Sequence, residues 1–289
     1  MTSTAAARST SLLCVFAICR SRTAAGLPAE LPTGLPAGTG HARGGPLTVL
    51  PIGDSLAALV QEVPAEEFTE QALQQRLADQ STLEACARAH HAAVSAAAAL
   101  GPVVPLPLAT LFTDRHRARS VLAESLERFH RVLNRTEGRV EWAVKVHLRR
   151  DSRPAAEPSP PEPAPAGPGA GRAYLSRVRG REQDRLSRQD AARAAAARVH
   201  DAVRGVAAGS VQRRPHGPRV TGNDRLQVMN AAYLVEEARG PELAALVRIM
   251  REEVALSGVD VDLSGPWVPY SFAEDVEDAE DAELAGERT

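Results

Sequence analysis

The sequence has few aromatic side chains, few cysteines and no long apolar run. Only 3% of its 289 residues are Phe, Trp or Tyr, and alanine supplies much of the 44% apolar share, so small aliphatic side chains must form the core. Cysteine occurs only at Cys14, Cys19 and Cys86, without a C-x-x-C pair, which argues against a disulfide framework or a zinc site and fits a reducing cytoplasm. No apolar stretch approaches the roughly 20 residues of a membrane span, so we expect no membrane insertion.

A large net charge is also lacking. The 34 Lys and Arg residues and the 36 Asp and Glu residues leave a net charge of -2, so no overall field draws the chain onto nucleic acid. Lys145 is the only lysine, and this Arg-rich composition is more typical of a GC-rich genome than of selection for phosphate binding. We therefore expect no nucleic-acid partner.

The common motifs of catalysis and nucleotide binding are absent. Lys145 follows no glycine loop, which excludes a P-loop, and no G-x-G-x-x-G, G-x-S-x-G or H-E-x-x-H motif occurs. The best candidate cluster is Cys86, His90 and His91, because Cys86 and His90 lie at i and i+4 of a predicted helix, where an imidazole could activate a thiol. His90 shares its helix seam with Leu83 and Val94, however, which favours a core or interface histidine. We expect no enzyme and no catalytic, cofactor-binding or metal-binding residue.

The first half of the chain predicts a small α+β domain over residues 10–136. The apolar run Leu12–Ile18 is typical of a strand and precedes a Pro- and Gly-rich loop over residues 26–46. The runs Leu47–Ile52 and Leu56–Val63 flank Gly53-Asp54, which predicts an antiparallel hairpin.

Two helices should complete this domain. The sequence Ser81-Thr-Leu-Glu84 matches a capping box, and Gly101-Pro102 should end the helix that it starts. Asp114 can cap a single amphipathic helix that runs to Leu133.

The second half predicts a domain over residues 137–273. Val140 to Leu148 alternates apolar and polar residues, which indicates a strand with one solvated face. The remaining predicted segments are a disordered Pro-rich insertion at 151–171, a long helix at 172–208, a weakly marked strand near 213–220, a strand at 228–235, a helix at 243–254 and a strand at 259–263. The order β-α-β-β-α-β predicts a ferredoxin-like domain whose sheet has one uncovered face, and residues 274–289 should form an acidic disordered tail.

Two segments could bind partners. The Arg-rich span from Arg172 to Arg188 could hold phosphates, an acidic protein or the chain's own acidic tail, although a solvated helix face is the commoner outcome. The segment Ser264–Phe272 concentrates three of the few aromatic residues between two prolines. These aromatic side chains either cap an alanine-rich core or anchor another protein, and both readings stay open.

This last segment carries a family resemblance. The sequence Gly265-Pro-Trp-Val-Pro-Tyr-Ser-Phe272 resembles the GPWPPYSF ending of the gas vesicle protein GvpL/GvpF family. The resemblance continues through Asn230–Val235, Gly171–Ser176, Gly138–Lys145 and the region around His90, and covers most of the chain. The sequence departs from the family at residues 105–110, Pro-Leu-Pro-Leu-Ala-Thr, where the family has P-L-R/K-F-G-T, and in the aromatic-poor first strand.

The resemblance implies a two-domain α+β protein with a modified ferredoxin-like C-terminal domain. Family members are accessory or minor structural proteins of gas vesicles, so it also implies a cytoplasmic, gas vesicle-associated protein without enzymatic activity or cofactor. We expect it to act in gas vesicle assembly by binding the shell-forming subunit and other accessory proteins. The residues singled out as an interface or structural signature are Gly265, Pro266, Trp267, Pro269, Tyr270, Ser271, Phe272, His90, Trp142, Lys145, Asn230 and Tyr233.

Two other functional classes remain open at this point. The first alternative is a cytosolic regulator that binds a small molecule through its ferredoxin-like domain, an inference from fold alone. The second is an enzyme built on Cys86 and His90, which predicts a thiol pKa below its ordinary value.

Overall fold

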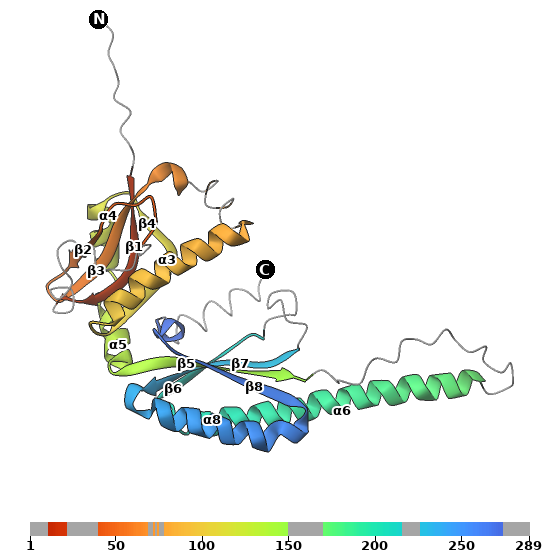
Figure 1. Cartoon of the computed structure of the whole chain (residues 1–289). Coiled ribbons are helices and arrows are strands. Elements are labelled where there is room, and N and C mark those ends of the chain that lie inside the picture. Colours follow the sequence, from red (N-terminus) through yellow and green to blue (C-terminus); the bar gives the residue numbers. More distant parts are fainter. Residues whose placement is uncertain are drawn as a thin grey trace, which may run out of the picture. The chain divides into compact units, whose positions relative to one another are not determined.

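The chain forms two compact units, which we describe separately. The computed structural model describes residues 11–21, 40–68, 72, 74, 78–149, 170–215 and 226–273, without the side chains of residues 170–175 and 177. Unit 1 contains the described residues up to Val140 and those from Trp267 onward, and unit 2 contains those within Glu141–Pro266 (Figure 1). The predicted C-terminal domain included residues up to 273, but residues 267–273 belong to unit 1. The acidic tail, most of the 26–46 loop and most of the 151–171 insertion lie outside the described residues.

Unit 1 is built on a four-stranded antiparallel sheet. Its strands are β1 (Ser11–Arg20), β2 (Leu47–Ile52), β3 (Leu56–Pro64) and β4 (Val103–Phe112), in the order β2-β3-β1-β4. The predicted first strand and the predicted hairpin are both confirmed. Gly53 takes a left-handed conformation, with φ of 58°, and the hairpin closes with Ile52 opposite Leu56.

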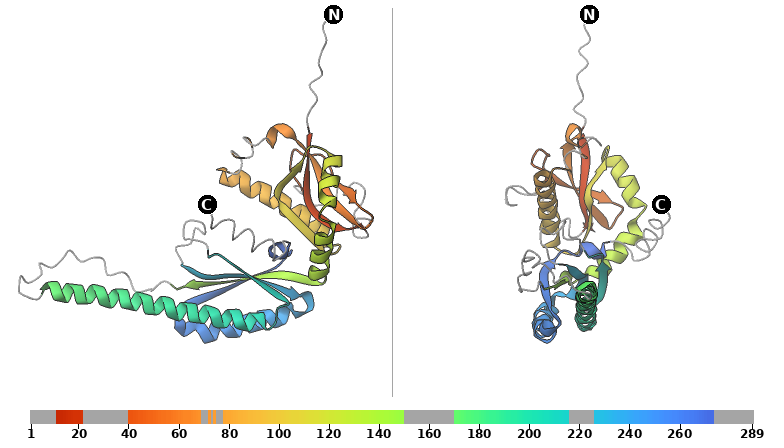
Figure 2. Two further views of the ribbon diagram at one scale, coloured as in Figure 1. Left: turned by 180° about the vertical axis from the view of Figure 1, so that it is seen from behind. Right: turned by 90° about the vertical axis from the view of Figure 1, so that its right-hand side faces the viewer.

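Helices cover both faces of this sheet. Helix α3 (Gln80–Ala98) packs on one face, and helices α4 (Arg115–Ala123) and α5 (Leu126–Thr136) pack on the other (Figure 2, right). The prediction of one helix from Asp114 to Leu133 is wrong, because the helix is interrupted at residues 124–125, between Ala123 and Leu126. The break redirects α5 so that Phe129 and Leu133 reach the same apolar cluster as Leu122 of α4.

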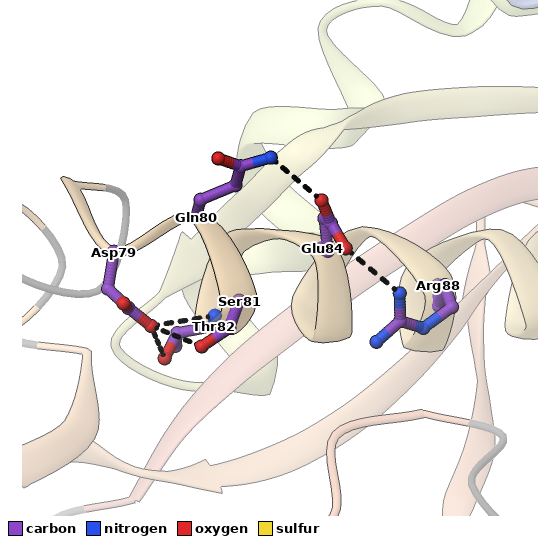
Figure 3. A network of polar contacts seen from close by, with 6 residues as sticks. All are labelled: Asp79, Gln80, Ser81, Thr82, Glu84 and Arg88. Atoms are coloured by element: carbon purple, nitrogen blue, oxygen red, sulfur yellow. Dashed lines mark hydrogen bonds and ion pairs between the residues drawn. The ribbon is translucent and has the colours of Figure 1, made fainter. Parts of the chain in front are cut away.

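The start of α3 differs from the predicted capping box. The N-cap is Asp79, whose Oδ2 accepts hydrogen bonds from Thr82 N at 2.8 Å, Thr82 Oγ1 at 2.5 Å and Ser81 Oγ at 2.7 Å (Figure 3). These bonds lower the pKa of Asp79, the one from the Thr82 hydroxyl most of all. A carboxylate caps better than the Ser81 hydroxyl here because its negative charge faces the positive end of the helix dipole. Glu84 instead accepts from Gln80 and pairs with Arg88 (Figure 3).

Unit 2 has the predicted element order β-α-β-β-α-β. Its elements are β5 (Arg139–Leu148), α6 (Ala170–Arg204), β6 (Gly209–Arg213), β7 (Gln227–Glu236), α8 (Gly240–Val254) and β8 (Val259–Trp267). The sheet order is β6-β7-β5-β8, and α6 and α8 lie side by side along one face of the sheet (Figure 1). Most of the weakly marked strand expected near 213–220 lies outside the described residues, and the strand that precedes β7 in the described part is β6, in which Val211 pairs with Ala232.

The core of unit 2 follows the predicted helix seams. Ala192, Ala196, Val199 and Val203 of α6 are buried in one cluster with four residues of α8, namely Leu243, Val247, Met250 and Val254. The prediction that the polar residues of β5 are solvated is wrong for Glu141 and His147, because each is buried with 7% exposure. His147 is enclosed by side chains of the neighbouring strands, since its Nδ1 lies 3.2 Å from Asp262 Oδ2 and its Nε2 3.5 Å from Gln227 Nε2.

Four short 3₁₀ helices complete the described elements. They are η1 (Ala65–Glu67), η2 (Glu237–Arg239), η3 (Ala255–Ser257) and η4 (Tyr270–Phe272). None of the helices in the described part of the chain is both long and apolar enough to cross a membrane.

Candidate interaction site at the C-terminal signature

The C-terminal signature, residues 265–272, begins at a glycine that packs against Trp142. Gly265 has φ of 140°, and a Cβ there would lie 2.9 Å from both the Glu141 carbonyl oxygen and the Trp142 ring. Trp142 also lies 3.4 Å from the Cβ position of Gly240 at the start of α8. The tryptophan thus fills the space left by two glycines of unit 2, which makes Trp142 and Gly265 packing residues.

Within unit 1, the middle of the signature packs against α3. The Tyr270 hydroxyl lies 3.2 Å from His91 Nδ1, and His91 Nε2 lies 3.3 Å from Ser95 Oγ. The Trp267 ring meets the same imidazole nearly edge-on, with ring centroids 6.1 Å apart. Burial raises the pKa of Tyr270 to about 12, so its hydroxyl keeps its proton near neutral pH. His91 is therefore the side chain of α3 that both aromatic residues share.

The end of the signature is held by α5. Arg135 Nη2 donates to the Phe272 carbonyl oxygen at 2.6 Å, and the guanidinium carbon lies 5.6 Å from the centre of the Phe272 ring. Arg139 Nη1 in turn donates to the Arg135 carbonyl at 2.6 Å. Phe272 is 3% exposed, and Ala273 joins the apolar cluster of α4 and α5. The signature thus runs from the α3 face of the sheet to the opposite face.

The exposure of these side chains shows which of them close the core and which could contact a partner protein. Pro269 and Phe272 are buried and Tyr270 and Ser271 half-buried, as expected of residues that close a core. Trp267 is 45% exposed and Pro266 is exposed as well. A large aromatic side chain that is held from one side and exposed on the other is a good anchor for a partner protein.

Three of the other singled-out residues lie in unit 2. Tyr233 is fully buried in unit 2, where its hydroxyl lies 2.6 Å from His200 Nδ1, and burial raises its pKa. Asn230 is 6% exposed on the same strand, and Lys145 is half-buried in β5. All three lie in the sheet of unit 2.

His90 is a core histidine of unit 1. It is 4% exposed, its ring lies 5.4 Å from that of Phe16, and neither ring nitrogen has a hydrogen-bond partner. Burial lowers its pKa to about 4, against a smaller opposing effect of the Leu106 backbone. His90 therefore lies in the apolar interior of unit 1, with its imidazole beside the Phe16 ring. Nowhere among the described residues are three His, Cys, Asp or Glu side chains grouped for a metal ion.

Two residues of the site were not identified from the sequence. His91 was considered only as a member of the candidate cluster with Cys86 and His90, and Arg135 was not considered. The Arg135 bond joins residues 137 positions apart. The amphipathic pattern of α5 places Arg135 near its C-terminus, but no local pattern connects that position with Phe272.

Unit 2 contains one further feature that could hold a ligand. A cavity of about 330 Å³ opens between α6 and the start of β7. Its lining residues are Gln189, Arg193, Pro215, Leu226, Gln227 and Val228. This volume is at the lower end of the range of small-molecule sites.

The fold is that of a known class of gas vesicle proteins. Crystal structures of gas vesicle protein GvpF from Anabaena and from Microcystis aeruginosa superpose with TM-scores of 0.59 and 0.54, each at 14% sequence identity. Each alignment covers 92% of this chain, with 97% of the Anabaena chain and 100% of the Microcystis chain.

Sequence comparison gives the family. The family model "Gas vesicle synthesis protein GvpL/GvpF" matches residues 12–274, and the chain belongs to this family. The chain is 38% identical over 253 residues to gas vesicle protein L from a Streptomyces species, with 86% of this chain and 92% of that protein covered. The resemblance seen in the signature is thereby confirmed.

Proposed function

We propose that this protein acts in gas vesicle assembly by binding the shell-forming subunit and other accessory proteins. Family membership over residues 12–274 supports a gas vesicle role, and the exposed Trp267 carries the binding part of the proposal. The protein would act in the cytoplasm and on the gas vesicle, as a non-enzymatic binding protein.

The anchoring of Trp267 supports its role as a contact residue. The imidazole of His91 packs edge-on against the indole, and the contacts of Tyr270 and Phe272 hold the segment that follows Trp267. A side chain that already packs on one side loses less conformational freedom when a partner binds its other side, so more of its contact energy is available for affinity. The shell-forming subunit must expose apolar surface before it joins a shell, and such a surface is a suitable partner for an indole.

Co-purification with the shell-forming protein tests this proposal. Tagged protein would be expressed with the products of its gas vesicle gene cluster and recovered in reducing buffer at moderate salt. We expect the wild type to retain the shell-forming protein, and Trp267→Ala to bind it about thirtyfold more weakly, since truncation of an aromatic anchor costs about 2 kcal/mol or more.

A matched exposed residue serves as the control. Leu256, in η3 of unit 2, is fully exposed, so Leu256→Ala removes exposed apolar surface from a residue that is not part of the signature. Equal retention by the wild type, Trp267→Ala and Leu256→Ala would contradict a contact at Trp267. No retention by any of them at several salt concentrations would contradict the assembly role.

We further infer that unit 2 is a modified ferredoxin-like domain. Two observations support this inference, namely the order β-α-β-β-α-β and the sheet order β6-β7-β5-β8 with α6 and α8 on one face. In this arrangement the two β-α-β halves interleave, so that β5 and β7, the first strand of each half, lie at the centre.

A small-molecule regulator is the second candidate function. The cavity beside Arg193 and Gln227 favours it, because a guanidinium and an amide at an otherwise largely apolar opening could orient a small anionic ligand. A thermal-shift screen of anionic metabolites tests this alternative. It predicts a rise in melting temperature that Arg193→Ala abolishes, and no rise with any metabolite would contradict it.

A further inference from the structure

Strand β2 forms an uncharged edge of the sheet in unit 1. It is the first strand in the order β2-β3-β1-β4, so one side of its backbone has no neighbouring strand in that sheet. Its sequence, Leu47–Ile52, contains no charged side chain, and Pro51 is exposed. An apolar edge strand of this kind can pair with a strand of another molecule and so cause association.

Two backbone carbonyls of β2 accept hydrogen bonds from helix α4. Arg115 Nη2 donates to the Val49 carbonyl at 3.1 Å, and Arg119 Nε donates to the Pro51 carbonyl at 3.2 Å. These donors lie on α4 and not on the paired strand β3, so both carbonyls belong to the outer side of β2. Because alternate residues of a strand face the same side, Leu47 belongs to this outer set as well.

The two arginines match the two carbonyls in spacing. Arg115 and Arg119 are four residues apart, which is a rise of about 6 Å along one side of a helix. Val49 and Pro51 are two residues apart, which is a rise of about 6.5 Å along a strand. Helix α4 lies beside β2, so successive turns of the helix supply one donor for each outer carbonyl (Figure 1). The arginines thus take the place of donors from a neighbouring strand.

A second copy of β2 would need the same two carbonyls. In an antiparallel pair centred on Val49, the two Val49 residues would exchange hydrogen bonds, and each Leu47 N–H would donate to the Pro51 carbonyl of the other copy. Pro51 itself has no N–H to donate. Every hydrogen bond of this pair would therefore end on an oxygen that an arginine already holds, so an added strand would have to displace Arg115 and Arg119.

An edge strand of the other sheet has contacts of the same kind. Strand β8 is the last strand in the order β6-β7-β5-β8. Arg251 Nε, on α8, donates to the Val261 carbonyl at 2.7 Å, and Arg149 Nη2 donates to the Val259 carbonyl at 3.1 Å. Arginine donors on backbone carbonyls thus occur at an edge strand of each unit, which supports a role specific to edges.

We propose that Arg115 and Arg119 block the edge of β2, so that it does not pair with the β2 strand of a second copy of this chain. A second copy is the occupant that they exclude, because β2 is complementary to itself in the register centred on Val49. The proposal concerns the association of this chain with itself and does not rest on the proposed role in assembly.

Removing the two side chains should produce dimers that pair at β2. Light scattering over a range of concentrations would compare the full chain as wild type, as Arg119→Ala and as the double variant Arg115→Ala with Arg119→Ala. Arg119→Ala frees the Pro51 carbonyl in both copies, so we expect the dissociation constant for self-association to fall by about tenfold. The double variant frees all four acceptors of the dimer, and its dissociation constant should fall by about a hundredfold.

Arg117→Ala is the matched control. Arg117 is an exposed residue of α4, as Arg119 is, and its replacement removes the same charge. Two residues turn a helix by about 200°, so Arg117 lies on the other side of α4 from Arg119. Its replacement should leave the dissociation constant unchanged. Both side chains are exposed, so both single variants should fold, which circular dichroism would verify.

A disulfide trap identifies the paired strand. In the register centred on Val49, the two Val49 Cα atoms would lie about 5.5 Å apart, which suits a disulfide. Val49→Cys would be introduced with Cys86→Ser, since the other two cysteines, Cys14 and Cys19, are buried. We expect mild oxidation to link the copies when Arg115 and Arg119 are both replaced, and to link few of them when both arginines are present.

Three results would overturn the proposal. Equal dissociation constants for the wild type, Arg119→Ala and the double variant would show that the arginines do not block the edge. If Arg117→Ala tightened association as much as Arg119→Ala, the cause would be the lost charge. Tighter dimers without a disulfide at position 49 would place the interface away from β2. If the double variant did not fold, Arg119→Ala against Arg117→Ala would decide the question.

Discussion

Replacing His90 should remove an acid sensitivity of unit 1. The His90 side chain is 4% exposed, has no hydrogen-bond partner at either ring nitrogen and has a pKa lowered to about 4 by burial. In the unfolded chain the histidine pKa is about 6.5, so between pH 6.5 and 4 the unfolded state binds a proton that the folded state does not. The stabilising effect of neutral His90 is complete above pH 6.5 and is lost as the pH falls.

The magnitude follows from the two pKa values. A difference of one pKa unit corresponds to 1.36 kcal/mol, so His90 should lower the free energy of unfolding by about 2 kcal/mol between pH 7 and pH 5. His90→Leu removes the titrating group and its two unpartnered nitrogens. At pH 7 we expect this variant to be as stable as the wild type or slightly more stable. At pH 5 it should be more stable by about 2 kcal/mol.

Urea unfolding followed by circular dichroism at pH 7, 6 and 5 measures this effect. The control is His116→Leu, because His116 is an exposed histidine on α4 of the same unit. His116→Leu should lose stability with acid in parallel with the wild type. If His90→Leu also loses stability in parallel with the wild type, burial of a neutral His90 is not the source of the acid sensitivity.

Other substitutions test the packing of the signature and the helices. Gly265→Ala should destabilise the fold by about 2 kcal/mol or more in urea unfolding, because its Cβ would clash at 2.9 Å and its φ of 140° suits only glycine. Gly180→Ala, with nothing within 4 Å of its Cβ on helix α6, should instead stabilise that helix by up to about 1 kcal/mol. Phe272→Ala should cost about 3–5 kcal/mol of unfolding free energy as a buried aromatic residue, whereas the half-exposed Trp267→Ala should cost about 1 kcal/mol. Equal losses for these last two variants would contradict the separation of structural and contact residues.

Local patterns predicted most of the secondary structure. The spacing of neighbouring residues predicts the strand β1, the hairpin at Gly53 and the apolar seam of α6. Each of these is found in the structure. Their stability comes from burying one apolar face, a requirement that periodicity reveals directly. The family was recognisable from the signature for a different reason, because eight consecutive residues with a glycine, two prolines and three aromatic residues are rarely matched.

Competition between similar local signals explains the helix errors. Asp79 and Ser81 can both cap α3, and the charge of Asp79 decides between them in the folded chain. The break between α4 and α5 has no proline or glycine to mark it. It exists because both helices must reach one apolar cluster, which is a property of the packed unit and of no single segment.

Long-range contacts explain what remained hidden at the site. The signature begins in the last three residues of β8, yet residues 267–273 pack in unit 1 through His91 and Arg135. These two side chains lie 179 and 137 positions from their partners Tyr270 and Phe272. No spacing rule in a single sequence identifies such distant pairs. The signature could therefore be recognised from its residues, but its packing in unit 1 could not be predicted.

Gas vesicle formation itself tests the central proposal most directly. A gas vesicle gene cluster would be expressed without this gene, and vesicles counted by electron microscopy after complementation with the wild type, Trp267→Ala or Leu256→Ala. We predict few or no vesicles without the gene, recovery with the wild type and with Leu256→Ala, and poor recovery with Trp267→Ala. Normal vesicle numbers without the gene would contradict a role in assembly, and full recovery with Trp267→Ala would contradict the contact assigned to its exposed indole.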